Sequence, residues 1–407
     1  MQFFLLYIDP GTGSALFTIV IGVAAVAYFL VRGIWLKLGI LFFRKQEDDN
    51  KQAKYVIYAE DKRYWGVFEP ILDQFEDRKI QLLYLTTSSD DPVFSSNYKF
   101  ITGKFIGTGN RAYAYLNFLT AEFLLTTTPQ LDVLQWKKSK RVLHYCHYIH
   151  AAGGPSLYRR YALDYFDSVL IPSYSDIQEI RDLESIRNTK EKILHVVGNT
   201  YFDRCIKKIK KIEESSSEKS HDFSILVSPS WGPSALLSVY GEKLLDPLIK
   251  TGWNIIVRPH PQSLISEKTM VDNLINRYRD MKNVEWDYNH ENIPTLIRSD
   301  LMISDFSGII YDYVFLLNRP VIVNIKDLDF RRLDAYDLKD KPFYYNSFKK
   351  VGYELDSAKL GSIKDVINKI INDKELDNKR LEIKNTMWAY QGQAAKRVAD
   401  FMIQACQ

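Results

Sequence analysis

Short apolar runs alternate with longer amphipathic stretches along most of this chain, and that alternation restricts its possible folds more than any other feature. Short apolar runs between helical patterns predict buried strands, and strands separated by helices predict a parallel sheet covered on both faces. In the first half of the chain the strand-like runs are Tyr55–Tyr58, Ile80–Leu85, Phe123–Thr127, Val142–Tyr145, Ser168–Ile171 and Ile193–Val197.

The alternation stops between Lys207 and His221, where the chain is charged, rich in serine and almost free of apolar residues. Because it then restarts, residues 207–221 are predicted to be a linker between two domains. The later strand-like runs are Ser224–Ser228, Asn254–Val257, Val284–Trp286, Leu301–Ser304 and Val321–Ile325. We therefore predict an α/β chain with two Rossmann-like doubly wound domains, residues 53–206 and 222–384, facing a ligand-binding cleft.

A charge-free apolar stretch of 21 residues covers residues 11–31. About 20 helical residues span the ~30 Å hydrocarbon core of a bilayer, so this stretch predicts one transmembrane helix. A cleavable signal peptide would need positive charges before the apolar run, where only Asp9 is found. The positive charges follow it, at Arg32, Lys37, Arg44 and Lys45. By the positive-inside rule we expect a single-pass protein of the cell membrane with its body on the cytoplasmic side.

A second apolar segment, residues 34–43, is interrupted by Lys37. We interpret it as an amphipathic helix in the membrane interface, with Trp35, Phe42 and Phe43 in contact with lipid. One long, tilted helix is the alternative. Either way, residues 1–45 are expected to form a membrane anchor.

Composition excludes several other classes of protein. The chain of 407 residues is 46% hydrophobic and 26% charged, which argues against wholesale disorder and against a polytopic membrane protein. Its net charge is only +4, so no basic field indicates a nucleic-acid partner. Cys146, Cys205 and Cys406 lie far apart without a CxxC pair, which argues against a disulfide framework and a cysteine-based zinc site.

The sharpest motif is Arg258-Pro259-His260-Pro261, directly after the strand-like run 254–257. Each proline fixes its own φ, so the loop is stiff and is expected to project a cation and an imidazole into the cleft. Arg258 suits phosphate because its guanidinium is a planar fork of donors. His260 can give or take a proton near neutral pH. A histidine that simply caps a loop is the alternative.

A second motif, residues 304–308, follows one strand and precedes a helix. The backbone N–H groups of Ser307 and Gly308 would lie at the positive end of that helix, where phosphates bind. Asp305 fits either this donor site or a plain N-cap. Asp312, one helical turn further on, is a weaker candidate for holding the donor's ribose or a basic neighbour.

Two other loops add candidates. Ser230 lies in Ser228–Ser234, a loop that suits a second wall of a phosphate pocket or an ordinary turn. His144, His147 and His150 are spaced three apart, but the run starts in a strand and ends in Gly-Gly, so we do not predict a metal site. His150, beside the segment AAGG, is best placed at the cleft to take a proton from a substrate hydroxyl.

These motifs resemble those of one known family. RPHP at residues 258–261, ISDFSGIIYDYVFLLNRPVI at 303–322 and GQAAKRVADF at 392–401 together resemble the CDP-glycerol glycerophosphotransferase family, whose bacterial members make teichoic-acid-like polymers at the membrane. The resemblance is clearest over residues 224–404 and looser over 141–204.

The resemblance implies a GT-B fold in which the C-terminal domain holds the nucleotide-linked donor and residues 385–407 cross back to the first domain. It implies that His150 is the general base and that His260, Asp305 and Ser307 contact the donor's phosphates. The expected reaction moves glycerol phosphate from CDP-glycerol, or a similar activated donor, to a hydroxyl of a lipid-linked or membrane-bound acceptor. CMP is released, and no metal or cofactor is needed.

The chain departs from the family pattern at two positions. Ala151 follows His150 where glycine is usual, and residues 229–232 read Pro-Ser-Trp-Gly instead of P-T-x-R. These departures keep two alternatives open. One is a GT-B glycosyltransferase that uses a nucleotide sugar, and the other is a non-catalytic membrane scaffold with the same fold.

Overall fold

The computed structural model describes residues 19–31, 33, 53–215, 222–289, 291–325 and 330–407. The chain divides into two compact units, Met1–Ala53 and Lys54–Gln407. In the first unit residues 19–31 are helical. Among the described residues, no helix is both long and apolar enough to span a bilayer. The predicted transmembrane stretch 11–31 begins outside the described residues, and all of segment 34–43 lies outside them.

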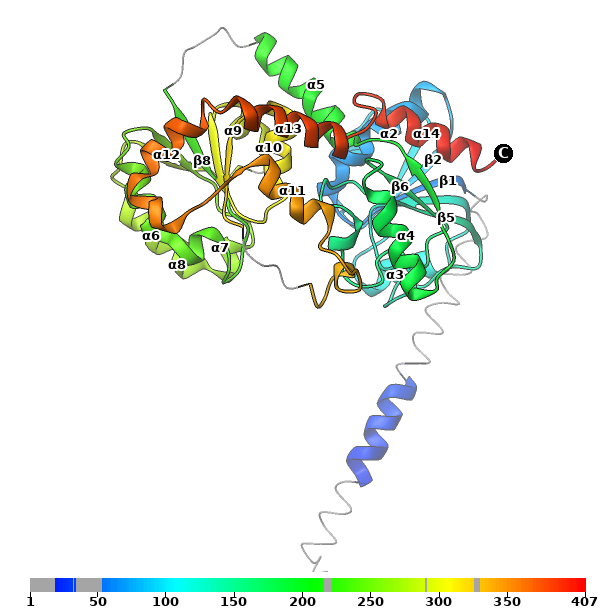
Figure 1. The fold of residues 1–407 in the computed structure, drawn as a ribbon. Helices are drawn as coiled ribbons and strands as arrows, with labels where there is room; N and C mark the ends of the chain where they lie inside the picture. Colours follow the sequence, from blue (N-terminus) through cyan, green and yellow to red (C-terminus); the bar gives the residue numbers. More distant parts are fainter. Residues whose placement is uncertain (1–18, 32, 34–52, 216–221, 290, 326–329) are drawn as a thin grey trace, which may run out of the picture. The chain divides into compact units, whose positions relative to one another are not determined.

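The first half of the second unit is built on a seven-stranded sheet, the N-terminal sheet (Figure 1). Its strand order is β3-β2-β1-β4-β5-β6-β7, and its strands run parallel. The strands are β1 (Ala53–Ala59), β2 (Leu82–Thr86), β3 (Ile101–Phe105), β4 (Ala121–Thr126), β5 (Val142–Tyr148), β6 (Ser168–Ile171) and β7 (Ile193–Val196).

The second half is built on a six-stranded parallel sheet, the C-terminal sheet, with the order β10-β9-β8-β11-β12-β13. Its strands are β8 (Ser224–Val227), β9 (Asn254–Val257), β10 (Val284–Trp286), β11 (Leu301–Ser304), β12 (Val321–Val323) and β13 (Tyr353–Glu354). Every residue of β8 and β11 is buried, as expected of central parallel strands covered on both faces. In each sheet the first strand pairs with the second on one side and the fourth on the other.

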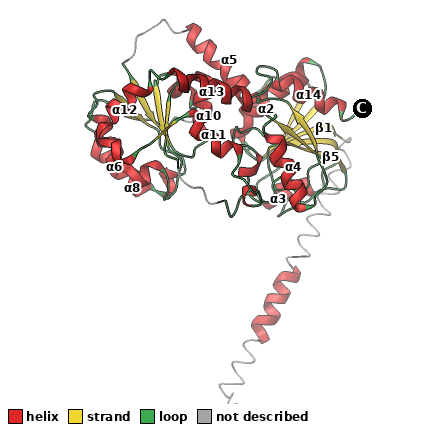
Figure 2. Cartoon of the chain, viewed as in Figure 1, coloured by secondary structure: helices red, strands yellow, loops and turns green. Residues whose placement is uncertain are grey.

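Helices cover both sheets (Figure 2). Those of the first half are η1 (Lys62–Tyr64), α2 (Trp65–Asp77), η2 (Pro92–Ser95), α3 (Asn110–Asn117), η3 (Pro155–Leu157), α4 (Asp176–Arg187) and α5 (Thr200–Ser215). Those of the second half are α6 (Leu236–Ile249), α7 (Ser263–Ser266), α8 (Lys268–Tyr278), α9 (Ile293–Ile297), α10 (Ile309–Leu317), η4 (Asp334–Tyr336), α11 (Phe343–Val351), η5 (Ser357–Ser362), α12 (Ile363–Ile370), α13 (Lys374–Met387) and α14 (Ala394–Gln404).

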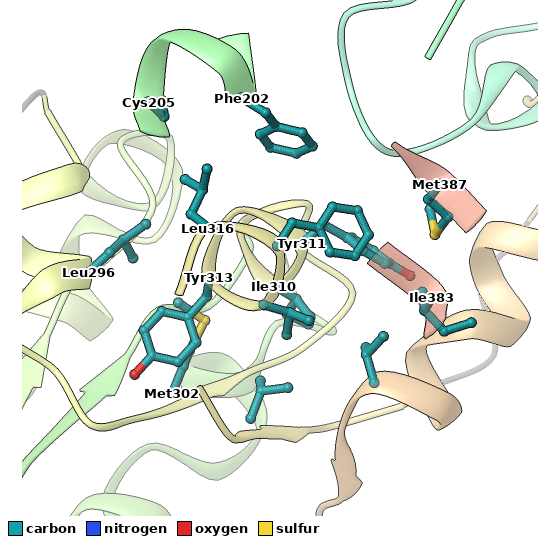
Figure 3. Packing of buried hydrophobic residues seen from close by; sticks show 14 of the residues in the cluster. Phe202, Cys205, Leu296, Met302, Ile310, Tyr311, Tyr313, Leu316, Ile383 and Met387 are labelled. Atoms are coloured by element: carbon teal, nitrogen blue, oxygen red, sulfur yellow. The ribbon is translucent and has the colours of Figure 1, made fainter. Parts of the chain in front are cut away.

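The predicted linker 207–221 begins inside helix α5, which continues to Ser215, and residues 216–221 lie outside the described part of the chain. The charged residues of this helix leave an apolar stripe intact. Phe202 and Cys205 of α5 belong to one buried cluster with α10, which Figure 3 shows from close by. Ile383 and Met387 of α13 complete that cluster, so α5 and α13 both pack against the helix that follows β11.

The end of the chain returns to the N-terminal sheet. Val398, Ala399 and Met402 of α14 are fully buried in the same core as β1, β4 and α2. The connection is fixed at Asp203 of α5, whose carboxylate accepts hydrogen bonds from the backbone N–H groups of Gly392 and Ala394 at 2.6 and 2.9 Å. Helix α14 therefore completes a core that began more than 300 residues earlier.

A second connection joins the two halves through residues 330–337, here called the strap. Its Leu333 forms an antiparallel bridge with Arg159, and the backbone N–H of Asp334 donates to the carbonyl of Tyr158 at 2.9 Å. Arg187 of α4 pairs with Asp334 at 2.6 Å. The strap thus anchors the loop that follows β5, residues 149–162, to the C-terminal half.

Candidate active site

The loops after β8, β9 and β11 meet at the carboxyl edge of the C-terminal sheet. Strands β8 and β11 are neighbours, and the chain leaves them toward opposite edges of the sheet. Ligands of open α/β sheets bind at the carboxyl ends of the strands at this switch point. The candidate residues of the second half, Arg258, His260, Ser230, Asp305, Ser307, Gly308 and Asp312, lie on these loops and on α10.

Asp305 connects two of these loops. It is fully buried, and its carboxylate oxygens accept hydrogen bonds from the backbone N–H groups of Ser230 and Leu236, both at 2.8 Å. Burial raises the pKa of Asp305, although these hydrogen bonds favour the ionised form. Each carboxylate oxygen therefore accepts one backbone N–H group, and the expected contact of Asp305 with the donor's phosphates stays a prediction. It positions the loop after β8 and caps α6.

Ser307 and Gly308 lie where the sequence places them, directly before α10. Ser307 is half-buried and Gly308 is exposed, so the helix N-terminus is accessible. The first N–H groups of a helix have no acceptor within it, and they carry the positive end of the helix dipole. The turn 305–308 therefore presents an anion site of the kind that binds phosphate.

His260 stands beside this turn. Its Nδ1 accepts a hydrogen bond from the backbone N–H of Gln262 at 3.1 Å, so the neutral ring carries its proton on Nε2. Partial burial lowers the pKa of His260, although the nearby carboxyls of Asp305 and Glu267 act in the opposite direction. The half-exposed ring of Trp231 lies 6.4 Å from the imidazole, centroid to centroid. His260 can thus donate a hydrogen bond beside an exposed aromatic surface.

Arg258 forms an ion pair within the C-terminal half. Its Nη1 pairs with the buried carboxylate of Asp287, and its Nη2 donates to the carbonyl of Asn289 at 2.6 Å. Burial alone would raise the pKa of Asp287, but hydrogen bonds from Thr295, Asn289 and Arg258 lower it. The cation is therefore neutralised at the end of β10. The sequence predicts that this cation projects into the cleft, and its contact with a donor phosphate stays a prediction.

The remaining two candidates are partly enclosed. Ser230 is buried, and its hydroxyl makes no hydrogen bond to any described residue. Asp312 is turned toward Asn292, whose Nδ2 donates to it at 3.3 Å, and toward Tyr201 of α5. Burial raises the pKa of Asp312 to about 7. Its contacts join the first turn of α10 to Tyr201 of α5 and to Asn292, the residue before α9.

On the other sheet, His150 follows β5. Its backbone carbonyl accepts a hydrogen bond from Asn199 Nδ2 at 2.7 Å, and the ring of Tyr64 meets its imidazole edge-on at 5.1 Å. Its Nδ1 is buried without a partner among the described residues. Burial lowers the pKa of His150 to about 4. The ring is therefore neutral at physiological pH, as a general base must be before it accepts a proton.

Tyr344 of α11 lies between the two halves of the site. A Cβ at Gly308 would lie 3.8 Å from its hydroxyl oxygen, and one at Gly153 would lie 3.6 Å from its ring carbon Cζ. Its hydroxyl makes no hydrogen bond to the residues that the structure describes. The loop after His150 and the N-terminus of α10 therefore face the same tyrosine.

Tyr344 and the residue that aligns it, Glu179, are not among the candidates that the sequence indicates. Glu179 of α4 accepts a hydrogen bond from Ser156 and another from the backbone N–H of Phe343, each within 2.8 Å. It thus joins the loop after β5 to the first turn of α11. Neither residue lies in a motif, and both lie far along the chain from the residues that they contact, so no local signal could have identified them.

The comparisons with known proteins bear on this geometry. A model of the family described as CDP-glycerol:poly(glycerophosphate) glycerophosphotransferase matches residues 188–404, more than half of the chain. The chain belongs to this family. It is therefore a transferase, and the matched region includes the loops after β8, β9 and β11 together with α14. A search of curated proteins finds no match to this chain.

Solved structures establish the fold. The wall teichoic acid polymerase TagF, studied with CDPG, aligns over 88% of this chain and 90% of its own with a TM-score of 0.57 and 15% identity. A protein described as a putative UDP-N-acetylglucosamine 2-epimerase from Listeria monocytogenes aligns over 86% of this chain and 95% of its own, with a TM-score of 0.55 and 13% identity. The UDP-GlcNAc 2-epimerase from Methanocaldococcus jannaschii aligns over 86% of this chain and 100% of its own, with a TM-score of 0.53 and 14% identity. This family member thus has a GT-B-like fold with two parallel sheets.

Proposed function

We propose that this protein transfers glycerol phosphate, or a similar polyol phosphate, from a CDP-activated donor to a hydroxyl of a membrane-associated cell-envelope acceptor. The family supports the reaction class. The observation that carries the proposal is the meeting of an anion site, the turn 305–308, with the loop of a neutral histidine, His150, at one tyrosine. Phosphoryl transfer needs both, since charge collects on phosphate oxygens while a hydroxyl loses its proton.

In the proposed reaction the acceptor oxygen attacks the phosphorus that bears the glycerol. The bond from that phosphorus to the bridging oxygen breaks, CMP leaves with both bonding electrons, and the acceptor's proton passes to His150. The N–H groups at Ser307 and Gly308 and the Nε2 proton of His260 stabilise the negative charge on the phosphates. Asp305 acts indirectly, because it holds the loop after β8 in place.

The C-terminal sheet would hold the donor and the N-terminal sheet the acceptor. The exposed ring of Trp231, next to His260, is a surface on which the cytosine base can stack. Trp231 stands in the loop where the family usually has an arginine-containing motif. Stacking on the base would supply donor affinity that such an arginine supplies elsewhere.

The proposal includes a membrane location. Residues 11–31 would cross the bilayer once, and the positive charges that follow them would keep the body on the cytoplasmic side. An anchored enzyme would meet a lipid-linked acceptor at the headgroup surface. Residues 34–43 would then lie in the interface or extend the helix.

The test measures nucleotide release by the full-length protein with CDP-glycerol, CDP-ribitol and UDP-sugars, each with membrane lipid extract. CMP release from a CDP-polyol that is lost in His260→Ala is the expected result. Release of UDP would assign a glycosyltransferase instead. No release, together with no change in melting temperature on adding any of the nucleotides, would identify a non-catalytic scaffold.

A further inference from the structure

The N-terminal sheet has a switch point of its own, between β1 and β4. The chain leaves β1 after Ala59 toward β2, and it leaves β4 after Thr126 toward β5, on the other side of the sheet. A cavity of about 620 Å³ lies at this point. Its lining residues are Glu60, Tyr113, Thr128, Pro129, Gln130, Leu134, Gln135, Trp136 and Arg159. Glu60 directly follows β1 and Thr128 closely follows β4, so the cavity occupies the place where open α/β sheets bind ligands.

Several polar side chains that line this cavity have no partner among the described residues, although Gln130 Nε2 donates to the carbonyl of Arg160 at 3.0 Å. The carboxylate of Glu60 and the guanidinium of Arg159 are both exposed. Among the described residues, neither group forms an ion pair or a hydrogen bond. The hydroxyl of Tyr113 makes no hydrogen bond either. Behind them, Thr128 Oγ1 and Trp136 Nε1 are buried without a partner in the described structure. Buried polar groups are normally satisfied, so Thr128 Oγ1 and Trp136 Nε1 are available to hydrogen-bond a ligand in the cavity.

The charges identify the kind of ligand. Arg159 suits a phosphate, to which a guanidinium donates two parallel hydrogen bonds. Glu60 is an acceptor that suits hydroxyl groups, and the ring of Tyr113 offers an apolar wall for a carbon skeleton. A ligand with only an anion would leave Glu60 facing a like charge, while one with only hydroxyls would leave Arg159 unpaired.

We propose that this cavity binds a phosphorylated polyol or sugar, with its phosphate on Arg159 and its hydroxyls on Glu60 and Tyr113. Nothing in the family match reaches this region, because the matched residues begin at residue 188.

Tyr64 connects the lining residue Glu60 to the candidate base. Glu60 is close enough to Tyr64 to act on the ionisation of its hydroxyl, and the ring of Tyr64 meets His150 at 5.1 Å. A hydroxylated ligand in the cavity would therefore lie on the His150 side of the molecule. Its role as the acceptor's terminal unit rests on the proposed function, whereas its binding does not.

Calorimetric titration of the full-length protein tests the site with sn-glycerol 3-phosphate as the probe. Glycerol and inorganic phosphate serve as probes that carry only hydroxyls or only the anion. We expect sn-glycerol 3-phosphate to bind at least tenfold more tightly than either. Arg159→Ala should weaken that binding at least tenfold, and Tyr113→Phe should weaken it several-fold. Arg279→Ala, which removes an exposed arginine from the end of α8, should leave the affinity unchanged.

Several results would overturn the proposal. They are the absence of sn-glycerol 3-phosphate binding, equal affinity for inorganic phosphate, and an affinity that Arg159→Ala leaves unchanged. Competition by CDP would also overturn it, because the probe would then be occupying the donor site. The proposed function fails separately, through the absence of nucleotide release. A protein that binds the probe through Arg159 but releases no nucleotide would retain the cavity and lose the transferase assignment.

Discussion

The two sheets of this protein have the same strand order around their first strand, yet their switch points are built in opposite ways. At the C-terminal switch point the charged side chains are satisfied internally: Asp305 accepts two backbone N–H groups, and Arg258 is paired with Asp287. At the N-terminal switch point the side chains of Glu60 and Arg159 have no partner among the described residues. The fold sets where ligands bind, and the loops decide which chemistry is offered there.

The difference has a functional meaning. At the C-terminal edge Asp305 positions the loop after β8, and the backbone N–H groups at Ser307 and Gly308 remain available for an anion. The N-terminal edge keeps its charges available for the ligand itself. We therefore expect substitutions at the two edges to affect different steps of the reaction.

The largest expected effect is on the N-terminal side. His150→Ala removes the proposed base and should lower kcat by about 10²- to 10⁴-fold, since general base catalysis contributes that much. The dissociation constant for CDP-glycerol should stay unchanged, because the donor is held by the other sheet. Single-turnover kinetics and calorimetry measure the two quantities. His195→Gln, on β7 and outside the site, is the control. A variant whose kcat equals that of the natural protein would remove His150 from the mechanism.

The next effect tests the residue between the two edges. Tyr344→Phe deletes one hydroxyl and keeps the ring, which packs on Tyr311 at 4.6 Å. The hydroxyl of Tyr344 lies beside the turn 305–308, so we expect it to donate to a phosphate bound there. A hydrogen bond to a charged group contributes about 1.5–3 kcal/mol, so kcat/KM should fall roughly 10- to 100-fold with little change in melting temperature. Tyr278→Phe, whose hydroxyl contacts Asp246 on α6, is the matched control and should affect stability only. Unchanged kcat/KM in Tyr344→Phe would show that its hydroxyl does not touch the phosphates.

A smaller effect is expected at the C-terminal edge. Trp231→Ala removes a half-exposed ring beside His260, so folding should be unaffected. Stacking of a base on an aromatic ring contributes about 1–3 kcal/mol, and we expect CDP to bind roughly tenfold more weakly. Calorimetry with CDP and with inorganic pyrophosphate separates the affinity that comes from the base from the affinity that comes from the phosphates. Equal losses for both ligands would contradict stacking on the base.

The smallest effect concerns stability and pH. The pKa of Asp312 is raised by burial from 3.8 to about 7, so the folded protein keeps a proton that the unfolded chain releases. Stability is therefore lost as pH rises from about 4 to about 7. Asp312→Asn cannot ionise, so its melting temperature relative to the natural protein should increase over this range and level off above it. A difference that does not vary with pH would show that Asp312 is ionised throughout.

Much of the fold could be predicted from the sequence because buried parallel strands are short apolar runs. The sequence does not predict β3 and β13, because these two strands lack this signal. β3 lies at a sheet edge, has only Ile101 buried, and contains Gly103, where a Cβ would approach Val93 to 2.8 Å. β13 has only two residues.

The candidate site was harder to predict. The motifs placed His260, Ser307 and Gly308 on the expected loops, but partners distant along the chain decided what each polar group does. Arg258 pairs with Asp287, 29 positions away, and Asp305 accepts a hydrogen bond from Ser230, 75 positions away. Local spacing carries no information on such contacts.

The packing of α14 also determines when this protein can finish folding. Ribosomes release the N-terminal sheet first, and domains generally fold in that order. Here Val398, Ala399 and Met402 fill the core of that sheet, and they emerge only after the whole C-terminal sheet has been synthesised. The first-made half must therefore wait with an open apolar surface for the last-made helix. A nascent chain stalled before Ala394 would expose that surface to chaperones and proteases.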